Sequence, residues 1–285
     1  MSRGALTISV DLELAWGNWD NLTDVHVRQV EHKERPIIRQ IVQLFDDYEV
    51  PVTWAFVAAL LDPRSAQGRP GGEHLWYAPD VIDVIRSARV AHDLGCHGGR
   101  HIYLDSVSQE LAEQDLAFAK SICQDNDIDI RSFVFPRNQI GHPELLEKYG
   151  LRVYRGNDKA WHQRIRNQHL LLGRVANLVD IILPLIPETV EPEREAGLVN
   201  LRGSLLFSGR NGLRRFAAPR TMAAKLRNGI DAASFTGRIF HLWFHPSNFW
   251  YDTTVQFKLL HDFLRCAARA RERGEIEIKP MSAFV

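Results

Sequence analysis

Apolar residues follow two spacings along the chain, one typical of short buried strands and the other of amphipathic helices. The strand-like runs cover residues 5–10, 50–57, 90–96, 131–135, 151–154, 198–207, 238–243 and 276–279. Helical spacing occupies the intervals, over residues 36–48, 79–88, 106–123, 144–149, 219–230 and 253–273. This alternation predicts an α/β fold: a mostly parallel sheet, closed or nearly closed, with the helices outside. Ser106 and Gln109 match a capping box at the start of the third helix.

The alternation breaks between residues 158 and 195. Apolar clusters at 170–172 and 178–186 lie there between polar and proline-containing stretches. No linker rich in Gly, Ser or Pro divides the chain, and no internal repeat is apparent. We therefore interpret residues 1–285 as a single domain and residues 158–195 as an insertion or lid within it.

The composition is that of an ordinary globular protein. Of the 285 residues 45% are apolar and 25% charged, and 35 Lys and Arg balance 35 Asp and Glu. Because there is no basic excess to neutralise phosphates, nucleic-acid binding is disfavoured. Cys96, Cys123 and Cys266 lie far apart, which argues against a disulfide framework or a thiolate zinc site. No signal peptide or transmembrane segment is recognisable, so we expect a cytoplasmic protein, with a peripheral place at the inner membrane face as the alternative.

Polar side chains capable of chemistry follow the carboxyl ends of the predicted strands, which is where barrel enzymes assemble their sites. They are Asp11, Glu13, His97, Arg137, Arg155 and His245. Strand alternation puts Asp11 and Glu13 on the same side of the first strand. His97 and His101 straddle a glycine pair, which favours a loop over a helix, and their spacing suits a metal site. The alternative is a pair of surface or hydrogen-bonded histidines.

Four segments resemble, in order, the motifs of the NodB-homology polysaccharide deacetylases, the family 4 carbohydrate esterases. They are residues 7–13 (TISVDLE), 97–101 (HGGRH), 133–138 (FVFPRN) and 242–246 (LWFHP). The resemblance implies a distorted (β/α) barrel with one divalent metal, commonly zinc, that hydrolyses N-acetyl groups on amino sugars. It also implies that Asp11 is the catalytic base and that His97 and His101 bind the metal.

The chain departs from the family pattern in three places. Where the family has two adjacent aspartates, the second acid here is Glu13, which we expect to be the third metal ligand or else to form a salt bridge. The family's third motif has an arginine before its proline, and here Arg137 follows Pro136 instead. We expect Arg137 to pair with Asp11 or to bind an anionic group of the substrate. Asp158 and Trp161 match the fourth motif only loosely.

The residue types suit the hydrolysis of an amide. Catalytic zinc keeps one open coordination position and lowers the pKa of water there from 15.7 to about 7. Asp11 would accept the proton of the attacking water, and His245 would protonate the departing amine. Arg137 would keep Asp11 ionised. We expect Zn²⁺, with Co²⁺, Ni²⁺, Mn²⁺ or Fe²⁺ as alternatives.

We expect further polar and aromatic residues to contact the substrate: Trp16, Arg100, Asn138, Arg155, Trp161 and Asn248. The expected substrate is an N-acetyl or N-formyl amino sugar in a nucleotide-linked, lipid-linked or oligomeric form, or a polysaccharide. Two other functions fit the same residues. One is hydrolysis of a non-carbohydrate amide, such as a ureide or a cyclic imide. The other is binding of sugars by a barrel that has no catalytic activity.

Overall fold

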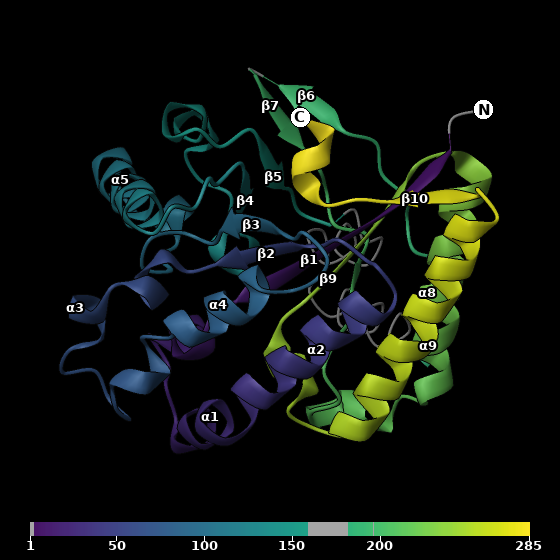
Figure 1. The fold of residues 1–285 in the computed structure, drawn as a ribbon, viewed down its shortest axis with the longest axis horizontal. Coiled ribbons are helices and arrows are strands. Elements are labelled where there is room, and N and C mark those ends of the chain that lie inside the picture. Colours follow the sequence, from purple (N-terminus) through teal and green to yellow (C-terminus); the bar gives the residue numbers. More distant parts are fainter. Residues whose placement is uncertain (1–2, 159–181, 196) are drawn as a thin grey trace, which may run out of the picture.

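The computed structural model describes residues 3–158, 182–195 and 197–285, which build one curled sheet with helices on its outer surface (Figure 1). The ten strands among these residues are β1 (Gly4–Leu12), β2 (Thr53–Phe56), β3 (Asp93–Cys96), β4 (Ser132–Val134), β5 (Val153–Arg155), β6 (Glu193–Glu195), β7 (Leu198–Asn200), β8 (Leu205–Leu206), β9 (Ile239–Phe244) and β10 (Ile276–Ile278). The strand order is β6-β7-β5-β4-β3-β2-β1-β9-β8, and β10 pairs with β1. Every pair is parallel except β6 with β7. The mostly parallel sheet with outer helices is thus confirmed.

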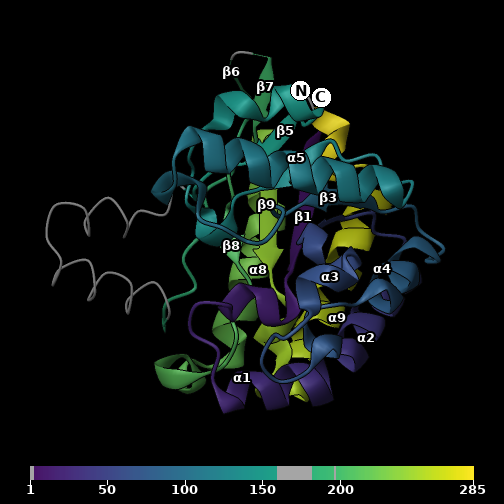
Figure 2. The ribbon, with the colours of Figure 1, turned by 90° about the vertical axis from the view of Figure 1, so that its left-hand side faces the viewer.

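The described α-helices are α1 (Asp24–Gln29), α2 (Arg35–Asp47), α3 (Pro63–Ala66), α4 (Pro79–Arg86), α5 (Gln109–Asp125), α8 (Pro219–Thr236) and α9 (Thr253–Glu272). In Figure 2 α5 crosses in front of the sheet. Both chain ends lie at one end of the molecule and α1 lies at the opposite end (Figures 1 and 2). Within the described chain, no helix has both the length and the apolar character needed to cross a bilayer.

The sheet curls into a half-barrel whose two edges approach each other near one segment. Val190 forms an antiparallel bridge with Ile239 of β9, and residues 193–195 then pair with β7 as β6. Since β9 and β7 lie toward opposite edges of the strand order, this segment spans the gap between them.

Side chains of β1 alternate between two cores. Leu6, Ile8 and Val10 face outward into the large core beneath the helices. Ala5 faces inward and joins a smaller core: Ala5, Ala55, Val134, Val153, Val190, Val199, Leu201, Ile239 and Met281. Ser9, farther along β1, forms a hydrogen bond with His241 of β9 (Oγ to Nε2, 3.0 Å). Burial lowers the pKa of His241 to about 3, so it packs as a neutral residue.

Three sequence-based element predictions were wrong in detail. The cap of α5 is Ser108, whose hydroxyl accepts the backbone N–H of Leu111, whereas Ser106 ends a separate 3-10 turn. The helix predicted over 144–149 consists of two 3-10 turns, Pro143–Leu145 and Glu147–Tyr149.

The strand predicted over 198–207 is two strands, β7 and β8, which pair with β5 and β9 toward opposite edges of the sheet. The chain crosses between them at Gly203, where a Cβ would lie 2.0 Å from Oδ1 of Asp158. The helix α1 was not predicted. None of its residues is buried, so its sequence has no helical spacing of apolar residues.

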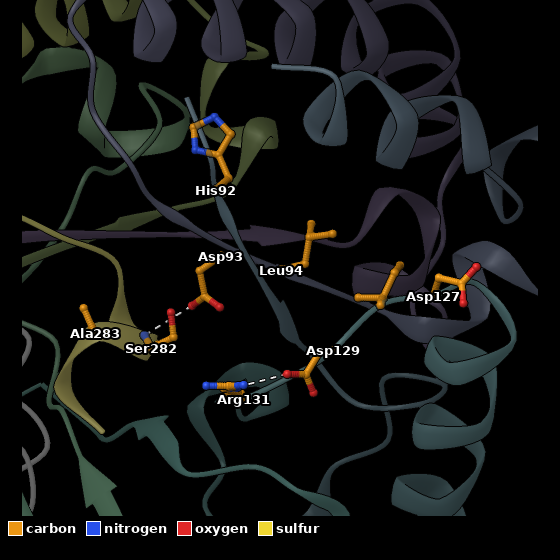
Figure 3. A pocket seen from close by; sticks show the side chains of 9 residues that line it. His92, Asp93, Leu94, Asp127, Asp129, Arg131, Ser282 and Ala283 are labelled. Atoms are coloured by element: carbon orange, nitrogen blue, oxygen red, sulfur yellow. Dashed lines mark hydrogen bonds and ion pairs between the residues drawn. The ribbon is translucent and has the colours of Figure 1, made fainter. Parts of the chain in front are cut away.

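A pocket of about 400 Å³ opens at the amino ends of β3 and β4, and Asp93 lies in its wall (Figure 3). Oδ2 of Asp93 accepts hydrogen bonds from the hydroxyls of Thr53 (2.8 Å) and Ser132 (2.6 Å) and from the backbone N–H of Ser282 (3.3 Å). Asp93 therefore ties the last turn of the chain, Met281–Phe284, to the sheet.

We expect Asp93→Ala to lower the free energy of unfolding by about 1–3 kcal/mol, because it leaves two buried hydroxyls without their acceptor. Urea unfolding followed by circular dichroism measures this. Asp129→Ala is the matched control. Asp129 borders the same pocket but is exposed and pairs with the exposed Arg131, and its loss should change stability by less than about 0.5 kcal/mol. Equal effects of the two substitutions on the free energy of unfolding would contradict the conclusion that Asp93 ties the last turn to the sheet.

Candidate active site

Five ionisable side chains meet at the carboxyl ends of the strands. Asp11 is near the end of β1, and Glu13 follows the strand. His97 and His101 lie on the loop after β3, and His245 directly follows β9. Because β9 and β2 flank β1 and β3 pairs with β2, these strand ends are close in space.

The histidine pair lies on a loop, as the glycines indicated. Gly98 has a φ of 83°, and a Cβ on Gly99 would lie 2.5 Å from the backbone oxygen of Asp115. The carboxylate of Asp115, on α5, accepts the backbone N–H groups of Gly99 (2.6 Å) and Arg100 (2.9 Å). The loop is thus held against α5, and only glycine allows so close an approach.

Glu13, His97 and His101 form a group that could hold a metal ion. Oε1 of Glu13 lies 2.9 Å from Nε2 of His97 and 3.1 Å from Nε2 of His101, and all three atoms lie within 4.8 Å of one another. Two ligands at about 2.0–2.1 Å from a tetrahedral zinc ion are separated by about 3.3 Å, so the spacing fits such an ion. Both histidines are at least 99% buried.

The hydrogen bonds of the two histidines support this fit. Nδ1 of His97 lies 2.8 Å from the carbonyl oxygen of Val134, which can only accept, so Nδ1 carries a proton. In neutral His97 the Nε2 lone pair therefore faces the Glu13 carboxylate, an arrangement that requires a cation or a proton between them. Burial lowers the pKa of His101, which favours its neutral form, and its Nδ1 has no hydrogen-bond partner among the described residues.

Asp11 forms a buried bidentate ion pair with Arg155. Nη1 and Nη2 donate to its two carboxylate oxygens, each at 2.7 Å. Burial raises the pKa of Asp11, but the guanidinium of Arg155 and the nearby His245 and His97 together outweigh this and leave the pKa below its usual value. Arg155 also donates to Oγ of Ser9 (3.0 Å) and to Oδ1 of Asn138 (2.9 Å). Asp11 is thus fixed in its ionised form.

The expected pairing of Arg137 with Asp11 was wrong. Nη2 of Arg137 donates to Oδ1 of Asp20 at 3.0 Å. Arg137 lies in a turn with a left-handed backbone (φ 53°) and its side chain is 46% exposed, whereas Arg155 ends β5 and is 99% buried. The inward side of β5 therefore supplies the positive charge beside Asp11.

His245 faces both carboxylates. Its Nε2 lies 3.5 Å from Oδ2 of Asp11 and 3.4 Å from Oε1 of Glu13. Burial lowers the pKa of His245, but the charges of Glu13 and Asp11 outweigh this and raise it to about 9. Asn248 contacts the backbone of His245 and positions it: its Oδ1 accepts the backbone N–H of His245 (2.9 Å), and its own backbone N–H donates to the carbonyl oxygen of His245 (2.9 Å).

Two of the residues expected to contact the substrate have side chains that make other contacts. Trp16 is 99% buried, its Nε1 donates to the carbonyl of Trp76, and Arg69 covers its ring at 4.1 Å. Its ring is therefore not available to a sugar. Arg100 is exposed and stacks on Phe118 of α5 at 3.5 Å. Trp161 lies outside the described residues.

Sequence reasoning missed several residues near the site. Glu34 ends a π-helical turn (Val30–Glu34) and accepts the indole N–H of Trp250, and burial raises its pKa to about 8. Asp158 accepts the indole N–H of Trp243, whose ring Arg155 covers at 4.3 Å. Only Asp158 had a sequence signal, the loose match to the fourth motif, since Glu34 follows no strand.

No family model matches the sequence, and no curated protein matches it either. Solved structures do match. A Mycobacterium smegmatis protein described as a polysaccharide deacetylase superposes with a TM-score of 0.69 at 13% identity, over 100% of this chain and 90% of its own. The chain has the fold of the polysaccharide deacetylases. A Pseudomonas aeruginosa protein described as a polysaccharide deacetylase (TM-score 0.63) and PuuE allantoinase (0.65) also share this deacetylase fold, each at 14% identity over 97% of this chain and 87% of theirs.

Proposed function

We propose that the protein is a metal-dependent hydrolase that removes an N-acetyl or N-formyl group from an amino sugar. One observation carries this proposal: the group of Glu13, His97 and His101 lies beside an ionised aspartate and a histidine at the carboxyl end of a deacetylase fold. The amino sugar would be nucleotide-linked, lipid-linked or oligomeric. Zn²⁺ is the ion that best suits two imidazoles and one carboxylate.

Glu13, His97 and His101 would hold the metal, which when bound supplies a Lewis acid for the acyl oxygen. Asp11 accepts a proton from the attacking water. Arg155 occupies one lone pair on each oxygen of Asp11, which leaves the second lone pair of each oxygen for this contact. Arg155 also keeps Asp11 from rotating, so the base is oriented before the substrate arrives.

His245 donates a proton to the amine nitrogen as the C–N bond breaks. Its Nε2 lies within 3.5 Å of both carboxylates, so the proposed acid is next to the proposed base and to the candidate metal ligands. Asn248 and the turn Pro246–Phe249 hold the backbone of His245 in this position. Ser9 and Asn138 support the base through Arg155.

Amine release from a panel of acylated compounds tests the proposal. We expect the zinc-loaded protein to release amine from N-acetyl or N-formyl amino sugars and to leave ureides and cyclic imides intact. PuuE allantoinase has the same fold, so allantoin belongs in the panel. Hydrolysis of the ureide but of no sugar would replace the proposal with an amidohydrolase. A protein that binds no stoichiometric metal and hydrolyses nothing would favour a sugar-binding barrel.

A further inference from the structure

Four side chains, here called the rim cluster, connect the candidate metal ligands to the solvent: Trp19, Asp20, Tyr103 and Arg137. Nε1 of Trp19 donates to the backbone oxygen of His101 at 3.0 Å. The Tyr103 ring lies 6.1 Å from the His101 ring and 6.1 Å from the Trp19 ring. The guanidinium of Arg137 covers Tyr103 at 5.2 Å. The rim cluster thus extends outward from His101.

Three of the segments that build the active site, those after β1, β3 and β4, also contribute to the rim cluster. Trp19 and Asp20 follow Glu13 on the segment after β1, and Tyr103 follows His101 on the loop after β3. Arg137 immediately precedes Asn138, which contacts Arg155 beside the base. A substrate held by the active site would therefore have the rim cluster as its neighbour.

Trp19 resembles a binding residue more than a core residue. Its indole N–H is fixed on His101, yet 41% of the residue remains exposed, while nearby Trp16 is buried. A rigid, partly exposed indole beside a polar site offers an apolar face on which the ring of a ligand can stack.

Arg137 keeps most of its hydrogen-bonding capacity. Asp20 accepts only from Nη2, and the other oxygen of Asp20 accepts the hydroxyl of Tyr103 (2.8 Å). Among the described residues, the remaining guanidinium donors have no hydrogen-bond partner. Asp20 and the Tyr103 ring therefore orient the guanidinium while its other donors stay available, and such a planar fork matches a carboxylate or a phosphate.

The backbone conformation of Arg137 is a further argument for a ligand at this side chain. Arg137 and Asn138 both have left-handed φ values, 53° and 55°. This conformation is costly for a residue with a side chain, and a half-exposed ion pair such as Arg137 with Asp20 returns little stability. The contact of Asn138 with Arg155 accounts for one of the two positions, whereas the surface pair with Asp20 does not account for the other.

We propose that the rim cluster is a substrate subsite, in which a sugar ring packs on Trp19 and an anionic oxygen group, carboxylate or phosphate, binds Arg137. This inference rests on the proposed function, since it names the substrate class of the same site. It predicts that the acylated amino sugar carries a negative charge close to the acylamino group.

Kinetics on wild-type protein test the charge preference. We expect N-acetylglucosamine 1-phosphate, the 6-phosphate or the N-acetylglucosaminuronic acid to have a kcat/KM at least about tenfold above that of neutral N-acetylglucosamine, since charge-assisted hydrogen bonds are roughly twice as strong as neutral ones. Comparing the two sugar phosphates with the uronic acid shows whether the subsite binds a phosphate or a carboxylate. Hydrolysis of charged and neutral sugars by the wild-type protein with equal kcat/KM overturns the proposal, whatever the variants do.

Arg137→Gln should remove the preference, because the charged sugars lose much more kcat/KM than the neutral sugar does, with the loss appearing in KM. Arg131→Gln is the matched control, because it removes one exposed arginine at the opposite end of the sheet. Trp19→Ala should raise KM for neutral and charged sugars alike. If Arg137→Gln lowers kcat/KM equally for both kinds of sugar, Arg137 is a structural residue and the subsite is refuted.

Calorimetric titration separates this inference from the proposed function. Glucosamine 1-phosphate and 6-phosphate should bind the zinc-loaded protein at least about tenfold more tightly than glucosamine, and Arg137→Gln should abolish the difference. This readout requires no turnover. If no sugar is hydrolysed but this difference is found, the proposed reaction fails and the subsite stands. Equal binding of the three amines overturns the subsite.

Discussion

His97→Ala is expected to lose the metal and to lower kcat/KM by more than about 10³-fold, because charge stabilisation by a catalytic ion amounts to several kcal/mol. His97 is one of two imidazoles in the group with Glu13, and its Nδ1 contact with Val134 fixes the ring toward that carboxylate. Without it, the ion would keep only His101 and Glu13. Metal content by mass spectrometry and amine release, measured on the same sample, check the prediction.

His32→Ala is the control for this variant. His32 has a side chain that is 68% exposed and pairs with Glu31 on the surface, so metal content and rate should stay at the wild-type values. Glu13→Gln should resemble His97→Ala, since an amide oxygen is a weaker ligand than a carboxylate. Full metal content in His97→Ala would contradict the assignment of the ligands.

Asp11→Asn is expected to keep the metal and to lower kcat by about 10²–10⁴-fold, the typical contribution of a general base. The amide keeps the shape of the side chain but accepts no proton at neutral pH. The variant also leaves the guanidinium of Arg155 buried without its counter-charge, which costs about 3–5 kcal/mol of stability. Metal content, kcat and urea unfolding must therefore be measured together.

A double variant separates the loss of the base from the loss of stability. Asp11→Asn combined with Arg155→Gln removes both buried charges, so part of the stability should return while kcat remains low. Asp80→Asn is the matched control, because Asp80 forms a surface ion pair with Arg35 (2.9 Å), far weaker than a buried one. Recovery of kcat in the double variant would show that Asp11 is not the base. Unchanged kcat in Asp11→Asn would favour the sugar-binding barrel.

The order of the elements and the positions of the main chemical groups could be predicted from the sequence. Apolar spacing depends only on neighbouring residues, so β1, β9, α2 and α9 were located to within a few residues. The same local pattern put Asp11, Glu13, His97 and His245 after strand ends. Because parallel strands of one sheet end on the same side, these positions already implied a shared site.

The choice of partners could not be predicted in this way. Arg137 and Arg155 both follow strands, and only the curl of the sheet and the left-handed turn at Arg137 decide that Arg155 reaches Asp11. Segments distant along the chain make these contacts, so no local pattern encodes them.

Burial was equally hidden from the sequence. Trp16 and Trp19 belong to one turn, yet the first packs under Arg69 and the second lies partly in solvent beside His101. Glu34 belongs to a polar stretch and is nevertheless enclosed, because Trp250 folds over it from the segment after β9. Local spacing therefore specified the elements and the side chains with reactive groups. Packing between distant segments specified which of those groups contact one another, which are buried and which are accessible to a ligand.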